Sequence, residues 1–331
     1  MKQTERLDQL IMLLANGEFH SGQAIGQSLS ISRAAVNQHI HKLEALGLEL
    51  FSVTGRGYKL ARPIELLQSA VIEKETPIQW RKAPPFEVRS VVDSSNDQVK
   101  QLASEGGLEA GFSLFAEAQT EGRGRRGKQW FSPFGSNLYF SVYWPLDDGI
   151  HGAMGLSLAV GVALAECFTE LGIEGVSVKW PNDVYIRGKK VAGILVDLET
   201  LPEGPAHSII GIGINLRVPE HVGAKIDQAW TDLSSELLQP VSRNHIAAQV
   251  RSFVLSALQR YAQNGLSAFE QSWRRYDCFL DKPVKLIMGQ RVCLGTCRGI
   301  DENGALLVED EQGVRRYFGG EVSLRAQDAI N

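Results

Sequence analysis

The segment GRGRRG at residues 122–127 matches the G-x-G-x-x-G pattern with which dinucleotide-binding folds hold a pyrophosphate. In those folds the pattern opens a helix, whereas here KQWFSP (128–133) follows and leads into a strand-like run at 137–144. Arginines also stand where a dinucleotide fold needs compact side chains. The segment therefore argues against a doubly wound α/β fold and predicts an anion-binding loop. Its positive charges are Arg123, Arg125, Arg126 and Lys128.

Strand-like and helix-like runs lie on both sides of this segment. We expect strands at 86–92, 113–116, 137–144, 176–179, 191–198 and 208–216, and helices at 96–103, 155–171 and 245–263. The two kinds of element do not alternate regularly. The pattern therefore predicts an α+β domain, with a mixed sheet and helices on one face, rather than a doubly wound one.

Two shorter strings are suited to bind a small polar or anionic ligand. KWPND (179–183) ends a strand with a lysine and turns at once, so we expect the Lys179 ammonium over the sheet surface. DSSN (93–96) follows a strand and caps the next helix, which offers hydroxyl and amide groups to a ligand. Either string alone is more typical of a surface lysine or a plain helix cap. Together with the arginine loop they form one candidate site.

The first sixty residues show the pattern of a winged helix-turn-helix. We expect helices at 22–29 and 33–46, and two short strands at 48–53 and 58–60 around a hairpin tip at 54–57. The second helix has one apolar face, so its polar residues can read base edges in a major groove. The predicted DNA contacts are Arg33, Asn37, Gln38 and His41 on that helix and Arg56 on the hairpin. A three-helix interaction module is the alternative.

Short strands separated by turn residues fill the last fifty residues, which is typical of a small SH3-like barrel. The fold prediction is thus an α+β protein with an N-terminal winged helix-turn-helix, a central mixed-sheet domain and a C-terminal SH3-like β-barrel. The expected boundaries are 1–63 for the winged helix, 64–82 for a linker with a helix at 64–73, 83–270 for the central domain and 271–331 for the C-terminal domain.

Composition excludes several classes of protein. The 331 residues are 44% hydrophobic and 22% charged, close to the average of globular proteins. The net charge of −4 excludes DNA binding by bulk charge alone, although residues 1–63 carry a net charge of +2.

The longest apolar stretch, Met154 to Ala165, is too short to span a membrane, and a cytoplasmic location is expected. The four cysteines form no disulfide framework, and Cys293 and Cys297 lack the second pair that a metal site needs.

The order of these strings resembles the biotin–protein ligase family. The strings that carry the resemblance are DSSN (93–96), Gln119 with GRGRRG (122–127), KWPND (179–183), GILV (193–196) and GIGIN (211–215). With the winged helix in front, the chain is similar to bacterial bifunctional proteins that combine a biotin ligase with a biotin-operon repressor. Departures from the family pattern are Ser95 in place of a common Thr, Lys128 in place of Arg and Ala118 in place of an aromatic residue.

The resemblance implies a two-step reaction. Biotin and ATP, with Mg²⁺ on the phosphates, give biotinyl-5′-AMP, and the acyl group then passes to one lysine of a biotin carboxyl carrier protein. The implied biotin contacts are Ser94, Ser95, Asn96, Gln119, Arg123, Gly124, Arg125 and Lys179. The implied adenylate contacts are Arg126, Trp130, Asn215, Trp230 and Arg325. The implied catalytic residues are Lys179, Arg123, Arg125 and Arg126.

The chemistry of this reaction agrees with the residues themselves. A carboxylate that attacks the α-phosphorus of ATP brings two anions together, so the site must position and neutralise them and needs no nucleophilic side chain. We further expect the Arg-Gly loop (residues 122–128) to be mobile through self-repulsion until it orders around the adenylate phosphate. Biotinyl-5′-AMP would then act as corepressor of a homodimer on operator DNA. The alternatives are a regulator that senses biotin without chemistry and a lipoate-type ligase.

Overall fold

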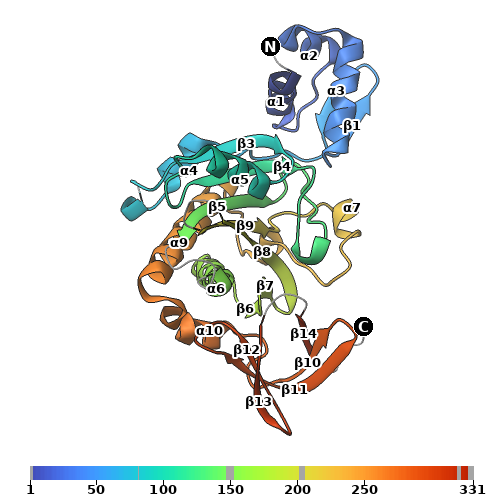
Figure 1. Ribbon diagram of the computed structural model, residues 1–331. Coiled ribbons are helices and arrows are strands. Elements are labelled where there is room, and N and C mark those ends of the chain that lie inside the picture. The colour runs from blue at the N-terminus through green and yellow to red at the C-terminus, as the bar shows by residue number, and fades with distance from the viewer. Residues whose placement is uncertain (1–2, 81, 147–152, 201–205, 319–321, 327–331) are drawn as a thin grey trace.

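The computed structural model describes residues 3–80, 82–146, 153–200, 206–318 and 322–326. Three parts follow one another along the chain, from the top of Figure 1 to the bottom: a small helical part, a central sheet with helices, and a C-terminal sheet. In these described ranges no helix is both long enough and apolar enough to cross a membrane.

The N-terminal part is a winged helix-turn-helix, as the sequence predicts. Ser21 and Ser32 begin its second and third helices, because their hydroxyls accept backbone N–H groups one turn ahead. Ser30, with a φ of 53°, makes the tight turn between these helices. The apolar core of the N-terminal part also includes Phe134 of the central part. The elements are α1 (Gln3–Leu14), α2 (Gly22–Leu29), α3 (Arg33–Ala45), β1 (Leu50–Val53) and β2 (Gly57–Leu60).

The linker after the winged helix is packed against the central part. Its helix α4 (Ser69–Glu75) begins later than expected, and a 3-10 turn η1 (Ile78–Trp80) follows. Helix α4 begins late because the backbone before it is bound to the central part. The Leu67 N–H donates to the Glu117 carboxylate at 2.5 Å. Glu117 also forms an ion pair with Arg243, and both side chains are only 5% exposed. Buried polar contacts thus fix the start of the linker.

The central sheet is mixed, as expected. Its strand order is β3-β4-β5-β9-β8-β7-β6, with β3 and β4 parallel and the other neighbours antiparallel. The sequence analysis missed β7, a strand of four residues that pairs with its neighbours along the chain, β6 and β8. The strands are β3 (Phe86–Val92), β4 (Ser113–Gln119), β5 (Leu138–Leu146), β6 (Val176–Lys179), β7 (Asp183–Ile186), β8 (Lys189–Thr200) and β9 (Ala206–Ile214).

The two faces of the central sheet are covered differently. Helices α6 (Ala153–Glu170) and α9 (Arg243–Asn264) pack together on one face over the largest apolar core (Figure 1). Helix α5 (Ser95–Glu105), which the sequence placed on the same face, lies on the opposite one, where Val99 packs among Leu114 and Ala116. It contacts β4, β5 and β9. The strands of that face that α5 does not cover lie beneath a cavity.

The C-terminal part is a five-stranded antiparallel sheet in the order β13-β12-β11-β10-β14. The expected barrel is not closed among the described residues, since β13 and β14 are the two edges. Closure is not needed to bury the inner face, because α6 and α10 pack against it. The elements are η4 (Leu266–Phe269), α10 (Glu270–Tyr276), β10 (Pro283–Met288), β11 (Arg291–Ile300), β12 (Leu306–Asp310), β13 (Gly313–Tyr317) and β14 (Val322–Ala326).

Candidate functional site

A cavity of about 620 Å³ lies over the central sheet. One row of paired residues crosses beneath it: Lys179, Asp183, Gly193 and Gly213. Directly paired residues point to the same face of a sheet, so this register aims Lys179 and Asp183 into the cavity. All ligand-binding residues predicted from the sequence line the cavity: Ser94, Ser95, Asn96, Gln119, Arg123, Gly124, Arg125, Arg126, Trp130, Lys179, Asn215, Trp230 and Arg325.

One end of the cavity is a network of hydroxyl and amide groups, called here the polar end (Ser95, Asn96, Gln119 and Ser141). Ser95 donates its backbone N–H to the Gln119 side chain at 2.8 Å, and its hydroxyl is 3.0 Å from the same oxygen. The Ser141 hydroxyl lies 2.7 Å from the hydroxyl of Ser95 and from Oδ1 of Asn96. Gly211 is required nearby, because a Cβ there would collide with Asn96. The sequence analysis missed Ser141, which lies beside Ser95 and Asn96 because of the way β5 pairs in the central sheet.

The Arg-Gly loop is a compact turn along the side of the cavity. The Gly124 N–H donates to Lys128 O at 2.7 Å, and the Trp130 N–H donates to Gly122 O at 2.9 Å. Arg126 takes a φ of 59°, and the one-turn 3-10 helix η2 (Arg125–Gly127) forms the tip. These bonds return the chain into β5 rather than into a helix, as the sequence predicts.

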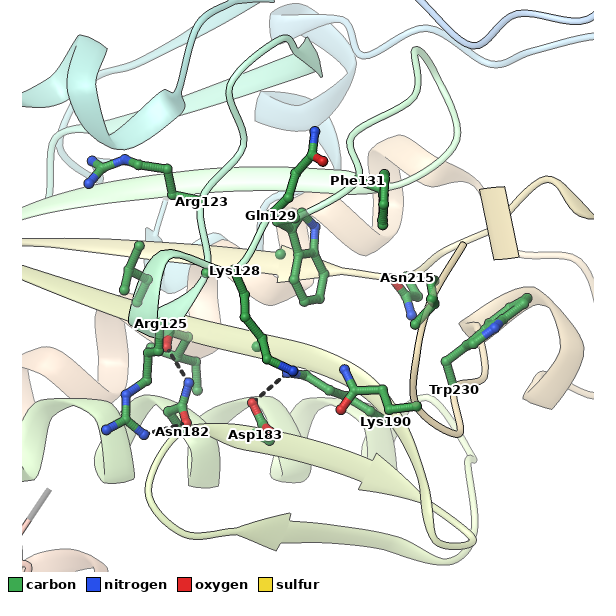
Figure 2. A pocket seen from close by; sticks show the side chains of 18 of the residues that line it. Arg123, Arg125, Lys128, Gln129, Phe131, Asn182, Asp183, Lys190, Asn215 and Trp230 are labelled. Atoms are coloured by element: carbon green, nitrogen blue, oxygen red, sulfur yellow. Dashed lines mark hydrogen bonds and ion pairs between the residues drawn. The ribbon is translucent and has the colours of Figure 1, made fainter. Parts of the chain in front are cut away.

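The charges of the Arg-Gly loop have partners within the protein, contrary to the expected self-repulsion. Arg123 forms ion pairs with Asp97 (2.5 Å) and Asp197 (3.0 Å), and its side chain points away from Arg125 in Figure 2. Lys128 pairs with Asp227 at 3.5 Å. Acidic residues distant in sequence therefore offset the repulsion that the loop composition alone predicts.

Arg125 is the arginine of the loop that reaches the KWPND turn. Its Nη1 donates to Oδ1 of Asn182 at 3.1 Å (Figure 2), and Nδ2 of Asn182 donates to Ile194 O at 2.9 Å. Burial is the main cause that lowers the pKa of Arg125, with a smaller effect of the neighbouring Arg126 charge. The guanidinium is thus partly desolvated, and an anion beside it would be held more strongly than at the surface.

Lys179 ends β6 with its ammonium in the cavity. Among the described residues it forms no ion pair, and its one hydrogen bond goes to the hydroxyl of Tyr185 at 3.3 Å. Burial lowers the pKa of Lys179, with the nearby Asp183 charge acting in the opposite direction. A partly buried ammonium with no carboxylate partner among the described residues is available to an anionic ligand.

Lys190 is a second cavity lysine, and the sequence analysis missed it. Its Nζ pairs with Asp183 at 2.8 Å, as Figure 2 shows, and the two side chains are 14% and 18% exposed. It also lies 5.5 Å from the ring centre of Trp130. The Trp130 indole lies over Gly193 and Gly213, and its Nε1 is buried without a hydrogen-bond partner in the described part of the chain. The unmet donor lies above Gly213, whereas Lys190 approaches the indole from the Gly193 side.

Two of the predicted adenylate contacts, Asn215 and Trp230, lie on the side of the cavity away from Arg123 and Arg125 in Figure 2. Nδ2 of Asn215 donates to Thr231 O at 3.1 Å, and Nε1 of Trp230 donates to Gly223 O at 3.2 Å. Gly223 belongs to α7 (Glu220–Gly223), and α8 (Leu233–Glu236) follows this segment. A planar indole beside an amide can hold a flat heteroaromatic ring.

The predicted DNA contacts lie together on the exposed side of α3 and on the wing. Arg33, Asn37, Gln38, His41 and Arg56 are all exposed. The guanidinium of Arg56 stacks 4.1 Å from the ring centre of Phe19. The opposite face of α3 is buried, so the helix has one face free for a partner.

The described residues contain no cluster of three or more His, Cys, Asp or Glu side chains that could hold a metal ion. Mg²⁺ is commonly bound through one or two carboxylates together with substrate phosphates. Asp183 and Asp227 are the carboxylates that line the cavity. The donor set therefore fits a magnesium ion that enters on a polyphosphate.

Three family models match the chain. The biotin/lipoate A/B protein ligase family matches residues 88–215, an HTH domain matches 6–59, and the biotin protein ligase C terminal domain matches 279–325. The first includes the Arg-Gly loop and Lys179, whereas the cavity residues Trp230 and Arg325 lie outside its matched range.

The chain is similar to curated proteins over its whole length. It is 43% identical over 331 residues to the bifunctional ligase/repressor BirA of Salmonella typhimurium, covering 99% of this chain and 100% of that protein. It is 42% identical over 320 residues to the protein of the same name from Escherichia coli, covering 97% of each. Among solved structures, the biotin protein ligase from Aquifex aeolicus in complex with biotin and ATP is 29% identical, with a TM-score of 0.62, covering 73% of this chain and 99% of that one.

Proposed function

The chain belongs to the biotin/lipoate A/B protein ligase family, and from this membership we propose that it is a bifunctional biotin–protein ligase and transcriptional repressor. The observation that carries the ligase activity is a single cavity that joins an uncharged polar end to a partly buried, cationic middle. Its DNA-binding activity is assigned to the winged helix-turn-helix at the N-terminus.

The polar end is assigned to the ureido ring of biotin. A ureido group offers two N–H donors and one carbonyl acceptor and carries no charge, which matches the hydroxyl and amide groups of Ser95, Asn96 and Gln119. The dithiolane ring of lipoate offers no such donors, so the same network would remain without ligand partners. This difference favours biotin over lipoate as the substrate.

The cationic middle is assigned to the reacting anions. The biotin carboxylate attacks the α-phosphorus of ATP, an acyl–phosphate bond forms, and pyrophosphate leaves. Lys179 and Arg125 would lie where both anions meet, so that they offset charge repulsion before reaction and stabilise charge during it. Mg²⁺ entering with ATP would neutralise phosphate charge, with Asp183 as the nearest carboxylate to the two cavity lysines.

The adenylate end would hold the nucleotide of the intermediate. Asn215 and Trp230 line the cavity on the side away from Arg123 in Figure 2, and Arg126, Trp130 and Arg325 line other parts of the same cavity. In the second step the amine of a carrier lysine attacks the acyl carbon, and AMP leaves with the electrons of the acyl–phosphate bond. The carrier is a biotin carboxyl carrier protein. Arg123, which is ion-paired in the structure, is assigned to hold the Arg-Gly loop near α5.

Repression is assigned to a homodimer with biotinyl-5′-AMP as corepressor. One winged helix carries few positive charges, so two copies on one operator are needed for strong binding. The domain boundaries that we propose stay at 63, 82 and 270, since residues 6–59 match a separate HTH model.

Biotin-dependent exchange of pyrophosphate into ATP tests the adenylation step. We expect exchange with biotin and none with lipoate. Operator binding that depends on biotin, in a protein without any exchange, would instead favour a biotin sensor without chemistry. Exchange with lipoate alone would identify a lipoate-type ligase.

A further inference from the structure

Lys179 and Lys190, two of the four lysines that line the cavity, have different partners. Lys190 lies against the Asp183 carboxylate at 2.8 Å. Lys179 lies 3.3 Å from the Tyr185 hydroxyl, with its Nζ 5.2 Å from the centre of the Tyr185 ring and 5.9 Å from that of Phe279. Lys190 is therefore neutralised by the protein, whereas Lys179 is surrounded by two aromatic rings and keeps its net charge.

Strand register explains this division. Along the β6–β7 hairpin, Lys179 pairs with Asp183 and Ser177 pairs with Tyr185, so Lys179, Asp183 and Tyr185 point to one face. The β7–β8 pairing is irregular between Val184 and Tyr185, and this irregularity places Lys190 directly opposite Tyr185. Lys190 can then reach back to Asp183. Asp183 therefore pairs with Lys190, and the Tyr185 hydroxyl is the hydrogen-bond partner of Lys179.

A phenol and a carboxylate would affect Lys179 in opposite ways. A carboxylate partner would cancel the ammonium charge and repel an incoming anion. A phenol accepts a hydrogen bond without carrying charge, and its ring face attracts a cation. We propose that Tyr185 is a positioning residue for Lys179, which holds the ammonium in the cavity, ready for the reacting carboxylate and phosphate, without neutralising it.

The C-terminal part supplies the second aromatic contact. Phe279 lies between α10 and β10, and the segment is fixed to β6 because the Cys278 N–H donates to Val178 O at 3.0 Å. Asp277 pairs with Val178 in an isolated parallel bridge. Phe279 is thus held at the end of β6 by backbone bonds, independently of Tyr185.

The electrostatics of the site give the proposal a pH signature. Burial lowers the pKa of Lys179, the Asp183 and Cys278 charges raise it, and those of Arg325 and Lys190 lower it. Burial also raises the pKa of Tyr185 above its usual range, so the phenol stays neutral near neutral pH. A hydrogen bond from the ammonium to the phenol stabilises the protonated lysine. Removing the hydroxyl should therefore lower the pKa of Lys179 further.

The test replaces the hydroxyl and the ring of Tyr185 separately. Tyr185→Phe removes only the hydroxyl, and we expect kcat of biotin-dependent pyrophosphate exchange to fall about five- to tenfold, with little change in KM for biotin. Tyr185→Leu removes the ring as well and should lower kcat about thirtyfold. Phe279→Leu should lower it about threefold. Tyr143→Phe is the matched control, since Tyr143 is a partly buried tyrosine that does not line the cavity, and we expect no change.

The pH profile separates positioning from a general loss of packing. The protonated lysine is the active form, so the alkaline limb of kcat should move to lower pH in Tyr185→Phe. The limb should stay in place in Tyr143→Phe. An unchanged kcat and an unchanged limb in Tyr185→Phe would overturn the proposal.

The role of Tyr185 depends on the proposed adenylation activity only in its kinetic test. A second measurement needs no activity: NMR titration of lysines labelled with ¹³C at Cε, with the Lys179 signal assigned from its absence in Lys179→Arg. We expect its titration midpoint to fall in Tyr185→Phe. Absence of exchange in the unsubstituted protein would count against the ligase function, whereas an unmoved Lys179 midpoint would count against the role of Tyr185.

Discussion

The winged helix and the central part assemble their functional residues in opposite ways. Arg33, Asn37 and Gln38 are exposed on one helix, where local sequence spacing alone brings them together. The cavity takes residues from α5, β4, the Arg-Gly loop, β6 and the segment before α8, and several are buried. Exposed side chains act through a partner that is itself solvated, whereas cavity residues act in a desolvated space. Single substitutions should therefore cost more in the cavity than on the winged helix.

Removal of the winged helix should have the largest effect and should be confined to one activity. A variant that begins at Ile64 keeps the linker contacts of Leu67 with Glu117, so the central part should fold. We expect it to biotinylate a carrier domain and to lose operator binding completely.

Operator titration and a carrier biotinylation assay check this separation, with the full chain as control. The separation of ligase activity from operator binding would be contradicted by a truncated protein that has the thermal stability of a folded domain yet neither binds biotin nor transfers it.

Substitution of Lys179 should have the next largest effect. Lys179→Ala removes a cavity cation that has no carboxylate partner among the described residues, and we expect exchange to fall about 10²–10³-fold with the fold intact. Lys179→Arg should also be impaired, because a planar guanidinium has a different shape and reach. Operator binding without biotin should be unchanged. Normal exchange in Lys179→Ala would leave the residue with a structural role only.

Arg125 tests the link between the two parts. Arg125→Gly removes a partly buried guanidinium that bonds to Asn182, and we expect biotinyl-5′-AMP to dissociate about 10- to 100-fold faster. Self-association and repression should weaken with it, although α3 is untouched. Sedimentation and operator titration, each with and without the adenylate, check this expectation. A monomer–dimer equilibrium that saturating adenylate does not shift would refute the coupling.

Single changes on α3 should have the smallest effects. Asn37→Ala or Gln38→Ala removes one base-edge contact, and we expect operator affinity to fall about tenfold. Exchange activity should not change. Substitution of Ala34, an exposed neighbour on the same helix, by Ser is the control. Equal operator affinity in all three variants would mean that another surface reads the DNA.

Local patterns were sufficient to predict the winged helix and much of the cavity. Helix caps at Ser21 and Ser32 act within one turn, and the predicted limits of β3 and β6 agree with the structure. The residues predicted for the ligand came from the strings shared with a known family, and they line one cavity. Their individual roles stay predictions.

The missed features depend on strand register and on contacts between distant segments. An irregular register in the β7–β8 hairpin places Lys190 opposite Tyr185, and Ser141 reaches Ser95 and Asn96 from β5. The Arg-Gly loop differs from expectation because Asp97, Asp197 and Asp227 offset its charge, and nothing near the loop in sequence indicates them. Hydrophobic periodicity carries no information about such partners.

The central claim is that the cavity activates biotin and passes it to a carrier lysine. Intact-mass spectrometry of a biotin carboxyl carrier domain, incubated with the full chain, biotin, ATP and Mg²⁺, tests it most directly. We predict a mass increase equal to one biotinyl group, present only with both biotin and ATP and abolished when the carrier lysine is replaced. A carrier domain of unchanged mass, in the presence of a folded protein that binds biotin, would contradict the account.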